Sequence, residues 1–189
     1  MIFQSVRFRN ELEKNENSDY SLLRIKRLSI SINDLSFLAG RWTGTGHAEY
    51  PTIHPVDYRE ELVFTRNEKD PVIHLEQKTW ITSPGRTNGE PIFWESGFLI
   101  EKETGLFELL MAQKSGRVEI LRCTPRRTGN DAFDLLFESS SIVNDSRVIR
   151  SGRKYTVTHD QLEYELLMST SANPPYQRHL HCRLTRSEK

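Results

Sequence analysis

Residues 40–46 read Gly40-Arg41-Trp42-Thr43-Gly44-Thr45-Gly46, a G-x-W-x-G-x-G pattern at the start of a long predicted strand. Glycines at every second position weaken a strand, because they add no packing and lose much backbone freedom. They fit a barrel wall, where a strand bends sharply or another part of the chain lies against it. The spacing therefore indicates a curved β-sheet, and Trp42 stands where it can close one end of a barrel.

After this motif, apolar residues recur at every second position, which is the period of a half-buried strand. Breaks rich in Gly, Pro, Asn and Asp separate the segments, so most neighbours should pair as antiparallel hairpins. Ten strands are predicted, at 41–50, 57–66, 71–82, 91–100, 105–113, 116–124, 131–142, 147–157, 161–171 and 177–186. Ten short strands must close or leave two exposed edges, so we expect an all-β, antiparallel up-and-down barrel of the lipocalin and fatty-acid-binding type.

The segment before the motif predicts a short helix over residues 33–40. Asn33 or Asp34 can cap its first turn, and Gly40 can end it. Residues 1–32 contain neither Gly nor Pro and carry six basic and four acidic side chains. We expect 1–32 to be a partly disordered extension and 33–189 to be the barrel domain.

The overall composition excludes several classes of protein. The 189 residues carry 26 Lys and Arg against 26 Asp and Glu, so the basic surplus of a nucleic-acid-binding protein is absent. No apolar run approaches the ~18 residues of a membrane helix, and the N-terminal residues lack the apolar region of a secretory signal. Two cysteines, Cys123 and Cys182, do not form a disulfide framework. We therefore expect a cytoplasmic protein that binds neither membranes nor nucleic acids.

Two strands show which side chains should line the barrel. In 161–171, Leu162, Tyr164, Leu166 and Met168 alternate with polar residues and should face inward. In 105–113 both faces are mostly apolar; if Phe107 to Met111 face inward, Gln113 ends an apolar lining.

Three further observations concern polar side chains. In the last strand, alternation alone places Leu180, Cys182 and Leu184 inside and leaves His179 and His181 in water. Glu60 and Glu61 must point to opposite faces, so they cannot act as a carboxylate pair. Whichever one points inward needs a partner such as Lys78 or Arg153, because a lone buried charge is costly.

Several segments together resemble the nitrobindin family of haem-binding β-barrels. They are Leu-Ser-Phe-Leu-Ala-Gly (35–40), the glycine motif (40–46), Glu-Tyr-Pro-Thr-Ile (49–53), Glu-Gln-Lys-Thr-Trp (76–80), Glu-Ser-Gly-Phe (95–98) and the ending over residues 166–184. A lipocalin shares the G-x-W but neither the Tyr-Pro-Thr-Ile nor the His-Leu near the C-terminus. The resemblance covers residues 33–186.

This resemblance implies one haem b per subunit at an open end of the barrel, with His179 as the axial iron ligand and catalytic residue. His181 competes as a ligand, and Cys182 stands where the family usually has a small Ala. The resemblance also places Thr52, Met168 and Gln113 near the haem. Phe93 stands where some relatives have a histidine, and Arg147 is a candidate partner for a haem propionate.

The activity implied is nitric oxide binding and the isomerisation of peroxynitrite to nitrate at ferric haem, without net redox change. Two alternatives remain open: a non-enzymatic carrier of a small apolar ligand, and a haem or nitric oxide sensor whose extension engages a partner. The carrier needs no imidazole at position 179, whereas the sensor predicts that residues 1–32 change order with haem state. The sequence also leaves open a homodimer.

Overall fold

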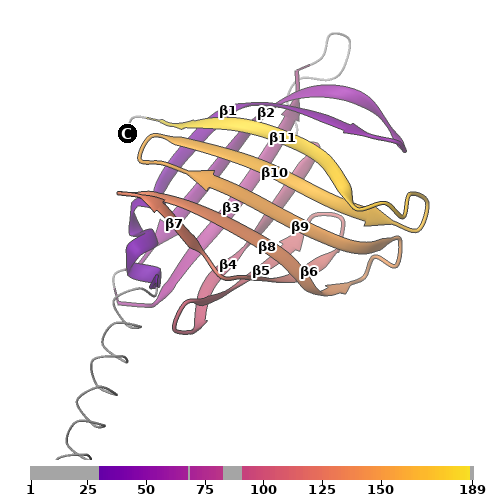
Figure 1. The fold of residues 1–189 in the computed structure, drawn as a ribbon. Helices are drawn as coiled ribbons and strands as arrows, with labels where there is room; N and C mark the ends of the chain where they lie inside the picture. The colour runs from indigo at the N-terminus through magenta and orange to yellow at the C-terminus, as the bar shows by residue number, and fades with distance from the viewer. Residues whose placement is uncertain (1–29, 68, 83–90, 188–189) are drawn as a thin grey trace, which may run out of the picture. The chain divides into compact units, whose positions relative to one another are not determined.

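The computed structural model describes residues 30–67, 69–82 and 91–187. The chain divides into two units, Met1–Ile30 and Ser31–Lys189, and the second is an antiparallel β-barrel preceded by a short helix (Figure 1). The expected extension over residues 1–32 lies, up to residue 29, outside the described residues. The barrel unit is therefore described by itself.

Within the described ranges, the barrel unit has one 3-10 helix and eleven strands. They are η1 (Ile32–Leu38), β1 (Gly40–Tyr50), β2 (Ile53–Arg66), β3 (Val72–Ile81), β4 (Phe93–Glu103), β5 (Leu106–Gln113), β6 (Val118–Cys123), β7 (Arg126–Gly129), β8 (Ala132–Val143), β9 (Val148–Val157), β10 (Gln161–Thr170) and β11 (Gln177–Arg186). Strands β1 to β6 and β8 to β11 each pair with their neighbours in sequence, and β1 pairs with β11.

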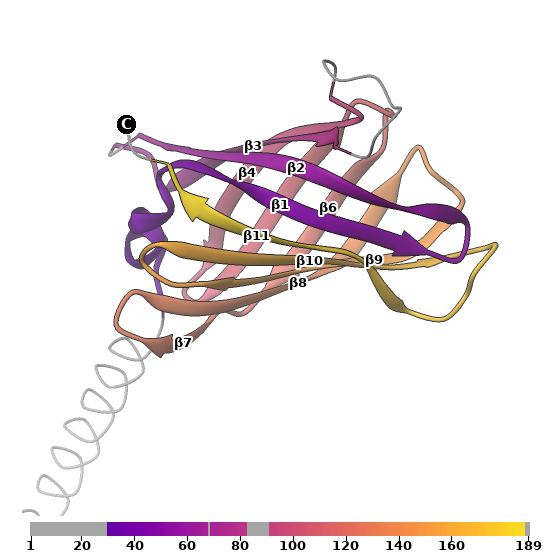
Figure 2. The same ribbon diagram turned by 90° about the horizontal axis from the view of Figure 1, so that it is seen from above.

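Pairing of β6 with β8 closes the ring, and the two strands lie side by side in Figure 1. Figure 2 shows the same barrel from above. The predicted ten-stranded antiparallel barrel with an N-terminal helix is thereby confirmed. Strand β7 is an additional short strand that pairs only with the start of β8. Its four residues are all exposed, so it lacks the alternation that marked the ten barrel strands.

The helix and the hairpin turns on its side form one end of the barrel, which we call the closed end. Trp42 is fully buried there, and its indole Nε1 donates to the carbonyl of Leu38 at 2.9 Å. The Phe37 and Phe133 rings stack with centroids 5.4 Å apart. The predicted role of Trp42 in closing the barrel is the one that the structure gives it.

The start of the helix differs from the expectation that Asn33 or Asp34 caps it. Ser31 is the capping residue, with an extended backbone. The Asp34 carboxylate lies in the first turn and accepts hydrogen bonds from the Ser31 backbone N–H and hydroxyl, both at 2.8 Å. The prediction placed the cap two or three residues late, because Asn and Asp are as common at this position as Ser.

Two glycines of the motif allow a close approach of chain segments, as their spacing predicted. A Cβ atom on Gly44 would lie 1.9 Å from the carbonyl oxygen of Arg183 on β11. A Cβ atom on Gly46 would lie 2.4 Å from the ring of Tyr58 on β2. Side chains at these two positions would therefore push β1 away from its neighbours.

The barrel interior has two parts. Toward the closed end, apolar side chains leave a space of only about 10 Å³, and its lining residues are Leu38, Phe64, Leu75, Leu99, Leu109, Leu135, Phe137, Tyr155, Val157 and Leu162. Midway along the barrel, buried charged groups follow, namely Glu60, Glu95, Glu119 and Arg153. The predicted inward face of β10 is confirmed, since Leu162 to Met168 are buried at every second position. On β5, where alternation left the inner face open, the face of Phe107, Leu109, Met111 and Gln113 is buried.

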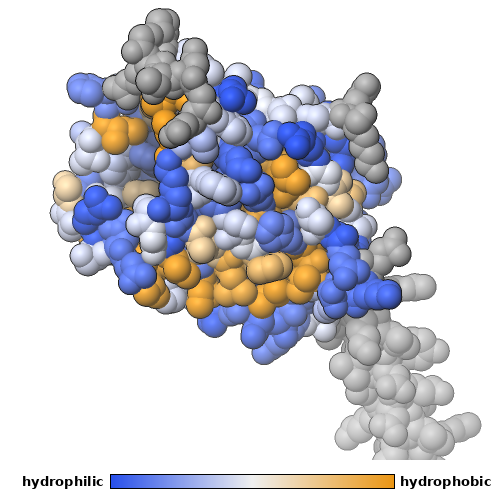
Figure 3. Space-filling view, turned by 180° about the vertical axis from the view of Figure 1, so that it is seen from behind, coloured by the Kyte–Doolittle hydropathy of each residue, from blue (hydrophilic) through white to orange (hydrophobic). Residues whose placement is uncertain are grey.

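The outer surface carries an apolar row of its own. The register places Phe98 on β4, Leu110 on β5 and Ile120 on β6 side by side. Phe98 is 48% exposed. Apolar side chains also gather in one area of the face that Figure 3 draws, among hydrophilic neighbours.

Candidate functional site

The end of the barrel opposite the helix, which we call the open end, carries His179 at an irregularity of β11. Leu180 pairs with Leu166 of β10, but the next pair joins Arg178 to Leu167, so the register skips His179. Pairing between β11 and β1 also stops at Leu180. A β-bulge of this kind re-aims a side chain, because the extra residue breaks the alternation of the two faces.

The bulge corrects the expectation that His179 lies in water beside His181. The Nδ1 atom of His179 is buried and has no hydrogen-bond partner. The ring of Tyr50, a buried residue at the end of β1, meets the imidazole edge-on with centroids 5.0 Å apart. Burial lowers the pKa of His179, and the positive charge of Arg117 lowers it further. The imidazole is therefore neutral at neutral pH.

A pocket of about 620 Å³ opens beside this histidine. It lies where β1 and β11 separate, so residues from both faces of the wall line it. They are His47, Glu49, Tyr50, Pro51, Ile53, Pro55, Gln177, Arg178, His179, Leu180 and His181. We call it the open-end pocket, and its volume falls in the ~300–1,000 Å³ range of cofactor and small-molecule sites.

Three of the other predicted residues lie at the same end. Thr52 is exposed in the β1–β2 turn, between two residues that line the open-end pocket. Met168 is buried on β10, and its carbonyl accepts a long hydrogen bond from the Tyr50 hydroxyl at 3.4 Å. Phe93, the first residue of β4, is half-buried and pairs with the buried Thr79.

Gln113 is buried but belongs to a polar cluster. Its Nε2 donates to Glu95 at 3.2 Å, and its carbonyl oxygen accepts from the Ser115 hydroxyl at 3.4 Å. It ends the apolar face of β5, as the sequence predicted. Its partner is a buried carboxylate, which the sequence analysis did not foresee.

Arg147 stands in the β8–β9 turn with a side chain 80% exposed. Its guanidinium holds Asp145 in a forked contact, with Nε to Oδ1 at 2.9 Å and Nη2 to Oδ2 at 3.1 Å. The structure therefore places Arg147 at the rim of the open end, already engaged with a carboxylate.

His181 lines the open-end pocket together with His179, whereas Cys182 is buried in the barrel. His181 is on the outer face, paired across the strands with His47, whose ring bonds Asp57 at 2.7 Å. Cys182 is fully buried, and its thiol donates to Glu60 Oε1 at 3.3 Å. Cys123 and Cys182 are both free thiols, and both are buried.

The prediction that Lys78 or Arg153 pairs with the inward-facing glutamate is wrong. Glu60 faces inward and Glu61 outward, as predicted, but neither Lys78 nor Arg153 contacts Glu60. Lys78 pairs with Glu76 at 3.1 Å on the outer wall, and the Arg153 guanidinium is taken by other carboxylates. Burial raises the pKa of Glu60 to about 7, against the lowering effect of hydrogen bonds from Gln77 and Cys182.

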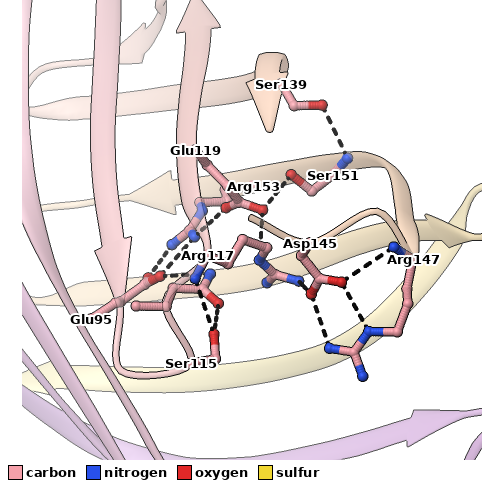
Figure 4. A network of polar contacts seen from close by, with 10 residues as sticks. Glu95, Ser115, Arg117, Glu119, Ser139, Asp145, Arg147, Ser151 and Arg153 are labelled. Atoms are coloured by element: carbon pink, nitrogen blue, oxygen red, sulfur yellow. Dashed lines mark hydrogen bonds and ion pairs between the residues drawn. The ribbon is translucent and has the colours of Figure 1, made fainter. Parts of the chain in front are cut away.

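A buried charged network was missed altogether (Figure 4). Arg153 is fully buried and bonds both Glu95 and Glu119, with Nη2 at 2.8 Å from an oxygen of each. Ser151 also donates to Glu119, at 2.9 Å. Burial opposes ionisation of Glu119, but the charges of Arg153 and Arg117 outweigh it and lower its pKa.

One signal in the sequence could have revealed this network. Glu95, Glu119 and Arg153 each occupy an inward position of an alternating strand, next to apolar residues such as Leu99, Leu121 and Val157. Single charges at such positions on several strands of one barrel can satisfy each other only inside it.

The fold and the site together define a class of protein: a closed antiparallel barrel that presents a neutral, half-buried histidine to a cofactor-sized pocket at its open end. No three His, Cys, Asp or Glu side chains in the described ranges are arranged to hold a metal ion by themselves. None of the helices in the described part of the chain is long and apolar enough to cross a membrane.

The chain belongs to the family described as "THAP4-like, heme-binding beta-barrel domain", which matches residues 31–186. This confirms the resemblance to nitrobindins. A protein named "Peroxynitrite isomerase Rv2717c" from Arabidopsis thaliana is 36% identical over 140 residues, which are 74% of this chain and 80% of that protein. "Peroxynitrite isomerase 2" of Mycobacterium marinum is 33% identical over 158 residues, 82% of this chain and 94% of the relative.

Solved structures agree with this assignment. The crystal structure of Rv2717c from M. tuberculosis superposes with a TM-score of 0.74 at 33% identity, covering 85% of this chain and 99% of that one. An S-type phycobiliprotein lyase from Guillardia theta has a TM-score of 0.57 at 11% identity, covers 85% of this chain and 94% of the lyase, and shares the fold alone.

Proposed function

We propose that this protein binds one haem b through His179 and uses the ferric form to bind nitric oxide and to isomerise peroxynitrite to nitrate. The observation that carries the proposal is the bulge at His179, which turns this imidazole away from the outer face and toward the open-end pocket. The names of the relatives supply the activity.

The residues present fit a haem. A histidine binds iron only when neutral, and burial already keeps His179 neutral. Its Nδ1 is enclosed, which leaves Nε2 as the nitrogen free to act as the ligand. The pocket is large enough for a cofactor. When bound, ferric haem supplies a Lewis-acidic iron at which a small anion can coordinate and rearrange.

The protein's own contributions are to hold and to surround the cofactor. Tyr50 packs edge-on against the imidazole and limits its rotation. Met168 and Phe93 would offer apolar contacts to a haem at this end of the barrel, and Thr52 lies between two residues that line the pocket. At the solvent-exposed rim, the guanidinium of Arg147 is suited to pair with a propionate, because its planar fork matches a carboxylate.

Of the two alternatives, the carrier finds little support in the interior of the barrel. An apolar ligand would need apolar space inside, and the apolar end has only about 10 Å³ left. Charged groups occupy the middle of the barrel, where an apolar chain would have to pass. The sensor concerns residues 1–32 and stays a prediction, as do the cytoplasmic location and a homodimer.

The test is a haemin titration of the wild type, followed at the Soret band, beside His179→Ala and His181→Ala. We expect His179→Ala to weaken haem binding by about tenfold or more and to change the axial spectrum, because it removes the iron ligand. His181→Ala tests the competing ligand, since His181 lines the same pocket. His159→Ala is the matched control, because His159 lies in the β9–β10 turn outside that pocket and bonds Asp160 at 2.6 Å, and it should bind haem like the wild type. Equal spectra for the wild type and His179→Ala would refute the ligand assignment.

Stopped-flow measurement of peroxynitrite decay then tests the activity itself. Ferric wild-type protein should accelerate the decay over a buffer control and give nitrate as the product. Haem binding without acceleration would reject the isomerase and leave a haem-binding or nitric oxide-binding protein.

A further inference from the structure

Two arginines of the polar network in Figure 4 are buried, but they differ in how well their charges are compensated. Arg153 has both terminal nitrogens bonded to carboxylates. Arg117 approaches its partners less closely, with Nε at 3.2 Å from Glu119 and Nη1 at 3.6 Å from Asp145. Buried charges are usually paired at hydrogen-bond distance, so Arg117 is the less satisfied of the two.

The Nε atoms of both arginines are buried and form no hydrogen bond. Arg153 nevertheless bonds two carboxylates through its terminal nitrogens, whereas Arg117 has only its ion-pair contacts with Glu119 and Asp145. Arg117 as a whole is only 8% exposed. A guanidinium held inside a protein with an unused N–H is an electrostatic site for an anion.

Arg117 also stands in the right part of the barrel. It directly precedes β6 and is two residues from the inward-facing Glu119, so its side chain faces the interior. The β5–β6 turn that holds it lies at the open end, as does His179.

The carboxylate of Asp145 contacts both Arg117 and Arg147, but at different distances. Asp145 is held by the fork of Arg147 at 2.9 and 3.1 Å, and this contact is closer than its contact with Arg117. Arg147 is exposed at the rim and Arg117 is buried. The two arginines thus flank one carboxylate, one on the solvent side and one on the interior side.

We propose that Arg117 is an anion-binding residue at the open end of the barrel, attracting and holding the small inorganic oxyanion on which the haem acts. This inference rests on the proposed function, since it assumes that the reactant binds at haem iron. Arg117 would bind the reactant, and Arg147 would pair with a haem propionate. Asp145 weakens the attraction of Arg117 for an anion, because its carboxylate neutralises part of the guanidinium charge. The chemical class of ligand is a monovalent anion of a few atoms, such as peroxynitrite, nitrate or azide.

Azide binding to the ferric holoprotein, followed by the Soret shift, tests the assignment. Arg117→Gln should weaken azide binding about fivefold to tenfold, because a positive charge close to the ligand is lost. Imidazole, a neutral ligand, should bind the variant as it binds the wild type. Arg122→Gln is the matched control, because this substitution also removes one positive charge. Arg122 is 59% exposed on the outer wall, where it pairs with Glu108 at 2.9 Å.

Two further variants keep the test decisive if Arg117→Gln folds poorly. Arg117→Lys retains the charge and should bind azide within about threefold of the wild type. Asp145→Asn removes the neutralising carboxylate and should tighten azide binding, which is the opposite sign. Unchanged azide affinity in Arg117→Gln, or weaker affinity in Asp145→Asn, would overturn the proposal.

The haem affinity of each variant separates this proposal from two other results. If Arg117→Gln lowers haem affinity and leaves azide affinity unchanged, Arg117 pairs with a haem carboxylate and the inference is wrong. If the wild type takes up no haem, the proposed function fails, and a nitrate titration of the unloaded full chain still tests Arg117. The arginine Nε–H resonance that disappears in Arg117→Lys should then shift with nitrate, and a resonance that stays unmoved would reject the anion site.

Discussion

The closed end and the middle of the barrel are built from the same strands but filled in opposite ways. At the closed end, Trp42 and its apolar neighbours leave almost no space. Further along four of these strands, charged side chains point into the same interior, namely Glu60 on β2, Glu95 on β4, Glu119 on β6 and Arg153 on β9. Apolar burial stabilises a fold directly, whereas a buried ion pair adds little net stability because desolvation offsets the attraction.

This difference suggests a division of labour along the barrel axis. The closed end holds the strands together, and the charged middle contributes position and field to the site above it. The comparison has consequences that can be measured, because apolar contacts do not titrate and carboxylates do.

The largest effect is expected at the closed end. Trp42→Ala removes a fully buried indole and the hydrogen bond to Leu38, and should lower the free energy of unfolding by about 3–5 kcal/mol. Urea unfolding followed by circular dichroism measures it. Trp94→Ala is the control, because Trp94 is 43% exposed on the outer wall and should lose about 1 kcal/mol or less. Similar losses in both variants would show that the closed end is not the stabilising part.

The next effect belongs to the charged middle and depends on pH. Burial raises the pKa of Glu60 to about 7, from an ordinary value of 4.5. Between these two values the folded protein binds a proton that the unfolded chain has lost, so Glu60 makes the protein less stable as pH rises, until the effect levels off above pH 7. At about 1.4 kcal/mol per pKa unit, the whole change is about 3 kcal/mol.

Glu60→Gln removes this titration. Relative to the wild type, the variant should gain about 3 kcal/mol in unfolding free energy between pH 4.5 and pH 7.5. Urea unfolding at several pH values gives the difference, and Trp42→Ala provides the contrast, since its loss should be the same at every pH. A constant difference between Glu60→Gln and the wild type would mean that folding does not raise the pKa of Glu60.

The two parts of the barrel also differ in how far the sequence predicted them. Alternation and turn residues predicted all ten barrel strands, because each depends on residues close together in the chain. The bulge at His179 depends on how β11 pairs with β10, which no local pattern contains. The resemblance to nitrobindins identified the residue, and alternation alone gave it the wrong face.

The charged network escaped prediction for a related reason. Glu95, Glu119 and Arg153 come from β4, β6 and β9, and each by itself resembles a solvated surface charge. Only the folded barrel brings them within ion-pair distance. Arg147, in contrast, was predicted from the resemblance as a partner for a haem propionate. In the structure its guanidinium donates two hydrogen bonds to the carboxylate of Asp145.

The smallest effect is expected at the open end, where the ring of Tyr50 contacts the imidazole of His179. The Tyr50 hydroxyl makes only long hydrogen bonds, to the carbonyls of Met168 at 3.4 Å and Asn173 at 3.2 Å, whereas its ring meets the imidazole edge-on. Tyr50→Phe keeps the ring and should cost about 1 kcal/mol or less in stability and change haem affinity less than about threefold.

Tyr50→Ala, which removes the ring as well, should weaken haem binding more than Tyr50→Phe does, because the enclosed Nδ1 of His179 has no hydrogen bond to fix the imidazole in its place. Haemin titrations of both variants decide between ring and hydroxyl. If Tyr50→Phe alone reproduced the loss seen in Tyr50→Ala, the hydroxyl would be the group that positions the histidine, and packing at the open end would matter less than its polar contacts. That result would extend the polar character of the barrel's middle up to the iron ligand itself.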